Sequence, residues 1–344
     1  MSAQPVASGQ PIAARPTHLP PSKLEPAEPV PLAVWPCAQT TGHAQRAGRY
    51  LPAATAHPAK MLPELARRII AEYAPPGSLV VDPMCGIGTT LVEATTQGCR
   101  SVGVELEGRW ADLARRNLAV ALPPERAGLG EVRAGDARHL PELLADLAGT
   151  VDLVATSPPY ACTPGMIDKP AWRDGGRLCR RDTQNYSPNR ANLGHARGAA
   201  YLAEMATVYA GCFQILRPGG LLVTVTRNLR RQGRVFDLAA ATVTLAEQAG
   251  YQYLQHVIAL LAAVRDSELH ARPSFWQLSQ TRRALGRGEP ASLLVHEDVL
   301  VFQKPQTSTG SGKLTGPQHE PECSADTSSP MDPWVGSGAT GSAS

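Results

Sequence analysis

The stretch that decides the fold runs from Leu79 to Thr89 and reads Leu-Val-Val-Asp-Pro-Met-Cys-Gly-Ile-Gly-Thr. Three apolar residues predict a short buried strand that ends at Asp82, and a helical pattern begins at Thr89. Two glycines lie between them, so the backbone can approach a ligand that any Cβ would push away. We therefore predict a ligand-binding loop over Asp82 to Gly88.

The glycine spacing in this loop excludes two common nucleotide-binding motifs. A dinucleotide fingerprint would need a glycine at the position of Leu91, and the Gly-Lys-Ser/Thr of a phosphate-binding P-loop is absent. Glu105, at the end of the next predicted strand, is placed to accept both hydroxyls of a ribose. The pattern therefore favours a nucleoside that carries no pyrophosphate.

Strand-like and helix-like runs alternate along the central part of the chain. We predict helices over residues 62–73, 89–97, 108–120, 140–147 and 202–216, and strands over 79–81, 101–105, 131–135, 151–156, 221–226, about 253–264 and about 293–303. This alternation predicts an α/β fold with a mostly parallel sheet and helices on its faces.

The two ends of the chain differ in composition from its centre. Residues 1–30 are rich in Pro and Ala, and residues 305–344 end in Gly and Ser, so we predict a disordered leader and a disordered tail. One domain over 31–304 is expected between them. Long polar stretches at 161–198 and 265–292 are predicted to be inserted loops.

Net charge, cysteine content and apolar run length exclude some classes of protein but do not indicate a particular function. The formal charge of +3 is too mild to indicate a nucleic-acid binder by itself, so a basic surface must be local. The seven cysteines include no Cys-x-x-Cys pair, which argues against a disulfide framework or a metal site. No apolar run is long enough to span a membrane and no signal peptide is recognisable, so we expect a cytoplasmic protein without a membrane partner.

The tetrapeptide Ser157-Pro158-Pro159-Tyr160 follows a predicted strand and carries the expected chemistry. An exocyclic amine of a nucleobase is a poor nucleophile because its lone pair is delocalised into the ring. The Ser157 hydroxyl and the Pro158 carbonyl can accept the amine hydrogens and localise that lone pair. Tyr160 offers a flat face for a base that has been flipped out of the duplex. A proline-rich turn after a buried strand is the alternative interpretation.

Together these motifs resemble those of the amino-group-specific DNA methyltransferases, which modify cytosine N4 or adenine N6. The resemblance covers about residues 50–304. It implies a Rossmann-like class I methyltransferase fold, in which a seven-stranded sheet has a reversed last strand, and S-adenosylmethionine as cofactor. It also implies DNA as partner and a restriction endonuclease as a candidate partner. Adenine enzymes of this family more often carry Asp or Asn at the position of Ser157, so cytosine N4 is preferred.

The predicted cofactor site combines the loop and strand-end residues with one further segment that resembles a motif of the family. His57-Pro58-Ala59-Lys60 resembles the motif that begins the family domain and packs near the methionine end of the cofactor. Asp136, which ends the third strand, is expected to contact the adenine amino group, with capping of the next helix as the alternative. The predicted cofactor-binding residues are His57, Pro58, Lys60, Asp82, Pro83, Cys85, Gly86, Gly88, Thr89, Glu105 and Asp136.

Nucleic-acid contacts are expected from two basic segments. The stretch 161–198 holds seven basic residues against three acidic ones, and a second cluster follows the fifth strand. The predicted nucleic-acid-binding residues are Lys169, Arg173, Arg177, Arg180, Arg181, Arg190, Arg230 and Arg231. Arginines in 265–292 form a third candidate, and solvated loops are the alternative for each segment.

Departures from the family pattern keep other functions open. The cofactor loop precedes the catalytic tetrapeptide, whereas many cytosine N4 enzymes have the reverse order. Similar loops occur in RNA guanine-N2 methyltransferases, which continue Asp-Pro-Pro-Tyr-Gly where this chain has Ser157 and Ala161. A nucleic-acid-binding protein that keeps the fold without catalysis is a third hypothesis. Pro36-Cys37 resembles the thiolate motif of cytosine C5 enzymes, but its position before the cofactor loop argues against that role.

Overall fold

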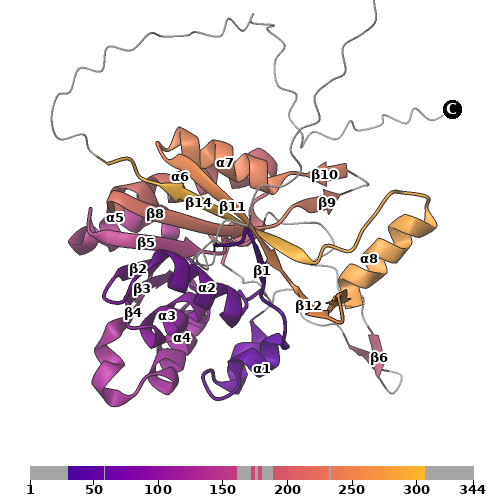
Figure 1. Cartoon of the computed structure of the whole chain (residues 1–344), viewed down its shortest axis with the longest axis horizontal. Helices are drawn as coiled ribbons and strands as arrows, with labels where there is room; N and C mark the ends of the chain where they lie inside the picture. Colours follow the sequence, from indigo (N-terminus) through magenta and orange to yellow (C-terminus); the bar gives the residue numbers. More distant parts are fainter. Residues whose placement is uncertain are drawn as a thin grey trace, which may run out of the picture. The chain divides into compact units, whose positions relative to one another are not determined.

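The computed structural model describes residues 30–57, 59–160, 172–174, 177–179, 189–231, 234–273 and 275–306. The chain divides after Leu32, and the unit that begins at Ala33 holds the helices and strands of the described residues. Its centre is an eight-stranded sheet (Figure 1). The strands, in sheet order, are β1 (Val34–Pro36), β11 (Gln252–Leu260), β14 (His296–Gln303), β8 (Leu216–Thr226), β5 (Val151–Thr156), β2 (Leu79–Asp82), β3 (Arg100–Glu105) and β4 (Gly130–Ala134).

One strand of this sheet runs against the others. β8, β5, β2, β3 and β4 are parallel to one another, and β14 is antiparallel to both of its neighbours, β11 and β8. The predicted mostly parallel sheet with a reversed last strand is confirmed. An eighth strand, which the sequence did not predict, extends one edge because β1 pairs in parallel with β11.

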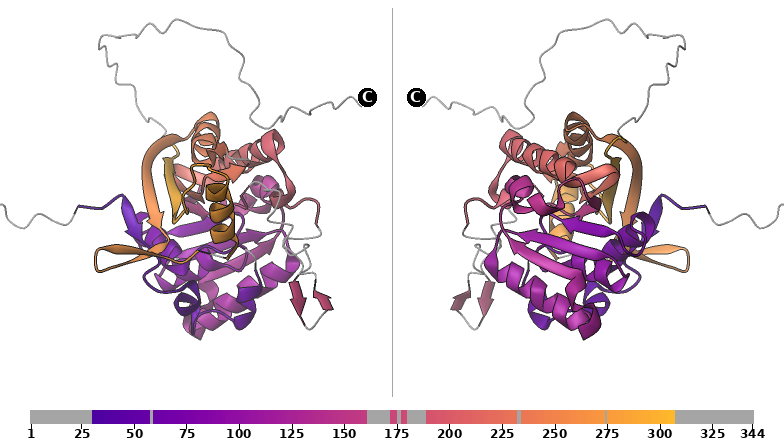
Figure 2. Two further views of the ribbon diagram at one scale, coloured as in Figure 1. Left: turned by 90° about the vertical axis from the view of Figure 1, so that its right-hand side faces the viewer. Right: turned by 90° about the vertical axis from the view of Figure 1, so that its left-hand side faces the viewer.

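Helices cover both faces of the sheet (Figures 1 and 2). They are α1 (Gly42–Arg46), α2 (Pro63–Tyr73), α3 (Thr89–Thr96), α4 (Gly108–Ala121), α5 (Leu140–Leu143), α6 (Gly198–Ile215), α7 (Leu238–Gln248) and α8 (Phe275–Gly286). Short 3-10 turns occur at η1 (Pro52–Ala56), η2 (Pro124–Leu129), η3 (Ala137–His139), η4 (Ala145–Leu147) and η6 (Leu193–His195). None of the helices in the described ranges is both long enough and apolar enough to cross a membrane.

The apolar core is divided by the sheet because strand side chains alternate between its faces. Val81 packs with residues of α5, α6 and α7 on one face, whereas Val80 packs with α2 on the other. A further cluster joins α3 to α4. Both faces of β2 are therefore buried, which explains why its sequence is a continuous apolar run rather than an alternating one.

The parallel strands all end at one edge of the sheet, which we call the carboxyl edge. Asp82 ends β2, Glu105 ends β3 and Thr156 ends β5. β14 begins at this edge because it runs in the opposite direction, and its Asp298 pairs with Thr226 of β8. Ligands of open α/β sheets bind outside the carboxyl ends of the strands, so this edge is the expected place for the site.

Several segments differ from their prediction, and the helices α1 and α7 were not predicted. The predicted turn after α6 lies within β8, where the pairing with β5 shifts register between Val151 and Leu153. The segment 265–292 is not a plain loop, because it contains part of the hairpin formed by β12 (Ala262–Arg265) and β13 (Glu268–Ala271) and all of α8. Within 161–198 the described residues include a short hairpin, β6 (Trp172–Asp174) and β7 (Arg177–Cys179). Polar loop-like composition did not reveal these hairpins because their strands are only three or four residues long.

Candidate functional site at the carboxyl edge

The loop between β2 and α3 has the backbone that the sequence predicts. Gly86 and Gly88 have φ angles of 53° and 80°, in the left-handed region that favours glycine. A Cβ on Gly86 would lie 3.3 Å from the His57 ring, and one on Gly88 would lie 3.1 Å from the Cβ of Ala114. Both glycines are thus required by conformation and by close packing. Of the other predicted loop residues, Pro83, Cys85 and Thr89 are buried.

Glu105 ends β3 with its carboxylate held by backbone N–H groups. Gly86 donates to Oε2 and Glu107 donates to Oε1, each at 2.8 Å. The side chain is therefore fixed against the glycine loop, and only 8% of the residue is exposed. Each oxygen keeps a second lone pair with which it can accept a ligand hydroxyl. This geometry fits the predicted contact with a ribose.

Asp82 lies behind the loop and joins it to the segment that leads into the Ser157–Tyr160 tetrapeptide. Its carboxylate accepts hydrogen bonds from the hydroxyls of Thr90 (2.6 Å) and Thr156 (2.9 Å) and from the Met84 N–H (3.1 Å). Asp82 and Thr156 lie 74 residues apart in the chain, and Thr156 directly precedes Ser157. One buried carboxylate therefore holds both halves of the site, and the direct cofactor contact expected of Asp82 stays a prediction.

Burial raises the pKa of Asp82 from 3.8 to about 6 and that of Glu105 from 4.5 to about 6. The folded chain holds these protons more tightly than the unfolded chain, so the stability that these two groups contribute should fall as the pH rises from about 4 to about 6. It should level off above pH 6. For Asp82 the fall is about 2–3 kcal/mol, at about 1.4 kcal/mol per pKa unit.

Urea denaturation across this pH range, compared between the wild type and Asp82→Asn, measures the Asp82 contribution. The asparagine does not titrate, so the wild type should lose more stability than the variant between about pH 4 and pH 6. Identical pH dependence in the two proteins would contradict the prediction. The pH dependence is the informative quantity, because the substitution also changes stability at every pH.

Asp136 caps the helical turn that follows it, which was the alternative to a cofactor contact. Its carboxylate accepts from the Arg138 N–H at 3.0 Å, which caps η3, and it also pairs with the Arg138 guanidinium. Arg138 in turn pairs with Glu204 of α6 at 2.9 Å. The guanidinium holds the pKa of Asp136 below its ordinary value against the opposing effect of burial. The predicted contact with an adenine amino group stays a prediction.

The segment before α2 brings His57 to the glycine loop. The His57 ring lies beside Gly86 and packs edge-on against Trp110, with 4.7 Å between ring centroids. Burial lowers the pKa of His57 to about 4, so the ring is neutral at pH 7. Lys60 donates to the His57 carbonyl oxygen, and burial lowers the pKa of Lys60 to about 8. Pro58 lies outside the described residues.

The tetrapeptide Ser157–Tyr160 leaves β5 at the carboxyl edge. Pro158 is buried, and the other three residues are half-buried. The Tyr160 hydroxyl donates to Oε1 of Glu297 at 2.9 Å, and Arg227 lies over the Tyr160 ring. Glu297 is the second residue of the reversed strand β14, and the sequence did not predict its place at the site. Its only signal was a polar start, His-Glu-Asp, before the apolar Val-Leu-Val-Phe of a predicted strand.

Of the described cysteines, Cys85 near the glycine loop and Cys37 of the Pro36-Cys37 pair are both protonated thiols. Burial raises the pKa of Cys85 well above its ordinary value and that of Cys37 to about 12. Cys37 is fully buried beside β1, and its N–H donates to the carbonyl of Leu260. Both thiols are protonated at pH 7 and are packing residues, in agreement with the low weight given to a cysteine nucleophile.

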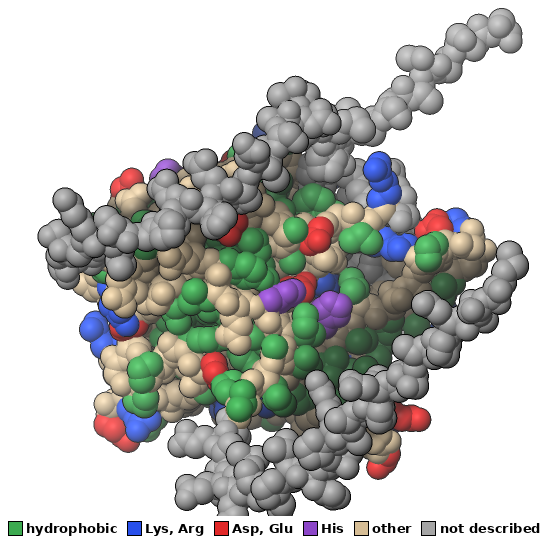
Figure 3. All heavy atoms as spheres, turned by 45° about the horizontal axis from the view of Figure 1, so that its top comes forward, with side chains coloured by type: hydrophobic (Ala, Val, Ile, Leu, Met, Phe, Trp, Pro, Cys, Tyr) green, Lys and Arg blue, Asp and Glu red, His purple; other side chains and the backbone are tan. Residues whose placement is uncertain are grey.

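Two of the predicted nucleic-acid-binding arginines can be placed with their side chains. Arg190 is exposed in a turn, and Arg230 is exposed on β9 (Leu229–Arg231), which pairs with β10 (Arg234–Phe236). Arg173, Arg177 and Arg231 are described only by the strands that carry them, while Lys169, Arg180 and Arg181 lie outside the described residues. On the face in Figure 3, charged side chains of both signs surround a broad apolar area. A nucleic-acid contact there would depend on individual arginines rather than on one basic field.

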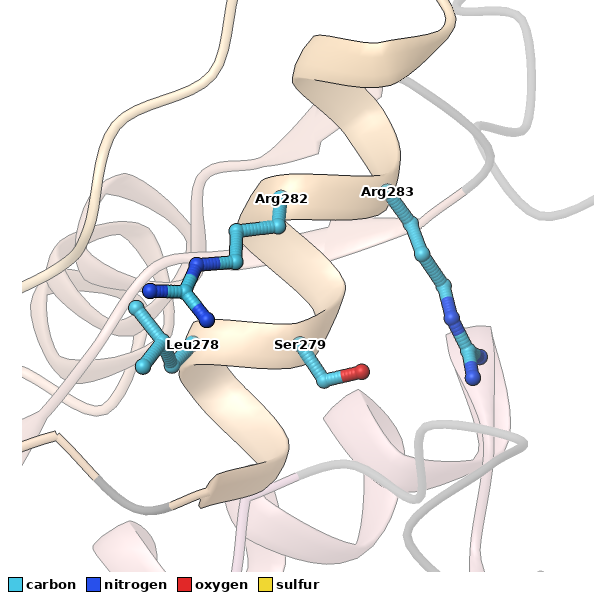
Figure 4. Close-up of a pocket in the computed structure, with 4 residues that line it drawn as sticks. All are labelled: Leu278, Ser279, Arg282 and Arg283. Carbon is cyan, nitrogen blue, oxygen red and sulfur yellow. The ribbon is translucent and has the colours of Figure 1, made fainter.

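Helix α8 adds two exposed arginines. Leu278, Ser279, Arg282 and Arg283 line a pocket of about 350 Å³ (Figure 4). Arg282 lies beside Leu278, and Arg283 extends from the other side of the helix. Arg282 and Arg283 belong to the third candidate segment, 265–292, whose contact with nucleic acid stays a prediction. The two arginines are available as phosphate contacts.

Comparisons with known proteins find methyltransferases whose named substrates differ. A family model described as DNA methylase, of the N6/N4 methyltransferase type, matches residues 7–116, which include the glycine loop and end before Ser157. The tRNA (guanine(10)-N2)-dimethyltransferase of Methanocaldococcus jannaschii is 34% identical over 118 residues, 33% of this chain and 33% of that protein. Type II methyltransferase M.ScaI of Streptomyces caespitosus is 34% identical over 92 residues, 27% of this chain and 29% of that protein.

Among solved structures, TrmN from Thermus thermophilus is 18% identical with a TM-score of 0.43, covering 76% of this chain and 53% of that one. The matches to the curated relatives span about a third of their length. S-adenosylmethionine fits the residues present, because backbone N–H groups hold the Glu105 carboxylate beside the glycine loop and each of its oxygens retains a lone pair for a hydroxyl. The reversed strand is that of a class I methyltransferase fold, the cofactor is S-adenosylmethionine, and residues 7–116 are similar to the amino-methyltransferase family.

Proposed function

We propose that the chain methylates an exocyclic amino group of a flipped base in DNA, with cytosine N4 preferred over adenine N6. The observation that carries this proposal is the hydrogen bond from Thr156 to Asp82, because it joins the tetrapeptide to the cofactor loop. When bound, S-adenosylmethionine supplies an electrophilic methyl group. The chain's own residues must then present the amine nitrogen to it.

The tetrapeptide has the groups that this task needs. The Ser157 hydroxyl and the Pro158 carbonyl oxygen can accept the two amine hydrogens, which localises the nitrogen lone pair toward the methyl carbon. As the new C–N bond formed, the bond from the methyl carbon to the cofactor sulfur would break, and one amine proton would become acidic and leave through these acceptors or to water. The burial of Pro158 helps exclude bulk water. Tyr160 gives the base a surface on which to stack, worth about 1–3 kcal/mol.

The choice of cytosine rests on Ser157, where the adenine enzymes that this chain resembles more often carry Asp or Asn. The choice of DNA rests on the family model and on the similarity to M.ScaI. The similarity to a tRNA guanine-N2 methyltransferase supports RNA as the second candidate polymer. Exposed Arg190, Arg230, Arg282 and Arg283 can contact the phosphates of either polymer.

Incubation with tritiated S-adenosylmethionine and duplex DNA or total RNA tests this proposal. We expect label in DNA, and digestion to nucleosides should show N4-methylcytosine. N6-methyladenine would keep the DNA function but reverse the base preference. Label in RNA alone would replace the proposal with the RNA function, and binding of the cofactor without transfer to either polymer would favour a non-catalytic binding protein.

A further inference from the structure

The reversed strand brings a carboxylate to the catalytic tetrapeptide. Asp298 of β14 pairs with Thr226 of β8, so the preceding Glu297 lies level with Arg227 at the carboxyl edge. β5, which leads into the tetrapeptide, pairs with β8 on its other side. Glu297 and Arg227 therefore reach Tyr160 from two strands that are remote from it in sequence.

These two residues hold the Tyr160 ring at different points. The Tyr160 hydroxyl donates to Glu297 Oε1 at 2.9 Å, which fixes the far end of the ring. The Arg227 guanidinium carbon lies 5.3 Å from the ring centre and over its face. A cation over an aromatic face is attracted by the ring electrons. The ring can therefore neither rotate freely nor stack a base on the face that Arg227 covers.

The charges around Glu297 support this arrangement. Burial raises the pKa of Glu297, while the Arg227 charge and the Tyr160 hydrogen bond oppose the rise. The neighbouring Asp298 raises that pKa further and His296 lowers it. Burial raises the pKa of Tyr160 well above its ordinary value, so the phenol keeps its proton and remains the donor. The positive charge of Arg227 thus partly offsets the cost of burying the Glu297 carboxylate, which accepts the hydrogen bond from the Tyr160 hydroxyl.

We propose that Glu297 is a positioning residue that fixes the plane of the Tyr160 ring, so that the target base stacks on the face opposite Arg227. The inference rests on the proposed function, because it assigns Tyr160 to a flipped base. Glu297 acts through Tyr160 and touches neither the base nor the cofactor. Its effect on methyl transfer must therefore disappear when the Tyr160 hydroxyl is absent.

A double-mutant cycle tests this dependence. Glu297→Ala and Tyr160→Phe should each lower kcat by about tenfold, the loss expected for one hydrogen bond to a charged group, with the KM for S-adenosylmethionine unchanged. The double variant should be no slower than either single variant within about twofold. Glu297→Gln keeps an acceptor oxygen and should recover part of kcat. Glu247→Gln is the control, because it makes the same change at an exposed residue of α7, and its kcat should match that of the wild type.

A spectroscopic measurement separates this inference from the proposed function. Tyrosine labelled with carbon-13 at Cζ reports hydrogen bonding of each phenol by NMR, and the Tyr160 signal is the one that Tyr160→Phe removes. This signal should move in Glu297→Ala and move less in Glu297→Gln. Retained thermal unfolding midpoints would show that the variants fold.

The outcomes are distinct. The cycle is measured on whichever polymer accepts methyl, so transfer to RNA alone overturns the DNA proposal and leaves this inference in place. Multiplicative losses in the double variant, or a Tyr160 signal that does not move, overturn the inference while the methylating function stands. A chain that methylates neither polymer refutes the proposed function and the positioning role of Glu297 with it.

Discussion

Substitution of Gly86 with alanine should weaken binding of S-adenosylmethionine by at least about tenfold while the chain remains folded. An alanine at a φ of 53° is strained by about 1–2 kcal/mol. Its Cβ would also lie 3.3 Å from Nε2 of His57, in the space between the loop and the segment that precedes α2. Either the loop or His57 must move, and both are expected to line the cofactor site. Equilibrium binding of the cofactor measures the loss.

Gly77→Ala is the matched control for this prediction. Gly77 has a φ of 90° and precedes β2 at the opposite edge of the sheet, and a Cβ there would meet no atom within 4 Å. It therefore introduces comparable backbone strain without filling the site. Equal losses of affinity in the two variants would show that strain alone acts, and the assignment of the loop to the cofactor would then lose its support.

Ser157→Ala should lower the rate of methyl transfer by about a hundredfold, with little change in the affinity for S-adenosylmethionine. The hydroxyl is proposed to accept an amine hydrogen as the nitrogen loses its planarity, so its contribution is larger in the transition state than in the ground state. Removal of one such preorganised polar group typically lowers kcat by about 100- to 1,000-fold. Single-turnover transfer at saturating cofactor separates the chemical step from binding.

Ser78→Ala serves as the control because Ser78 is buried just before β2, at the edge of the sheet away from the tetrapeptide. This variant should transfer methyl at the wild-type rate. If Ser157→Ala also retained full activity, the acceptor role would be wrong and the Pro158 carbonyl would have to suffice. A loss of cofactor affinity in Ser157→Ala would instead indicate a structural role at the loop.

Much of the fold could be predicted because its signals are local. The apolar run before Asp82, the glycines of the loop and the helical pattern of α3 all lie within about twenty residues. Each element also has propensities and a pattern that agree with its place in the sheet. The reversed strand could be expected only from the family resemblance, since no local pattern in β14 distinguishes a parallel from an antiparallel partner.

The rest of the site depends on pairings that the sequence does not display. Glu297 lies 137 residues from Tyr160, and only the register of β14 against β8 brings the two together. Asp136 shows a different limit, because an acidic residue at the end of a strand suits both a ligand contact and a helix cap. Hydrophobic periodicity also gives no sign of the contact that Arg227 makes, because its partner is the ring of Tyr160, which is remote in sequence.

The shared carboxylate of Asp82 has a thermodynamic consequence. Its oxygens bond to Thr90 in the first turn after the glycine loop and to Thr156 just before the tetrapeptide. A ligand that shifts one of these hydroxyls alters the bond that the same carboxylate makes to the other. Linkage then requires reciprocity: by whatever factor the methyl donor changes the affinity for the acceptor, the acceptor changes the affinity for the donor by the same factor. Replacement of Asp82 should therefore change this factor equally for both substrates, because its side chain carries the coupling.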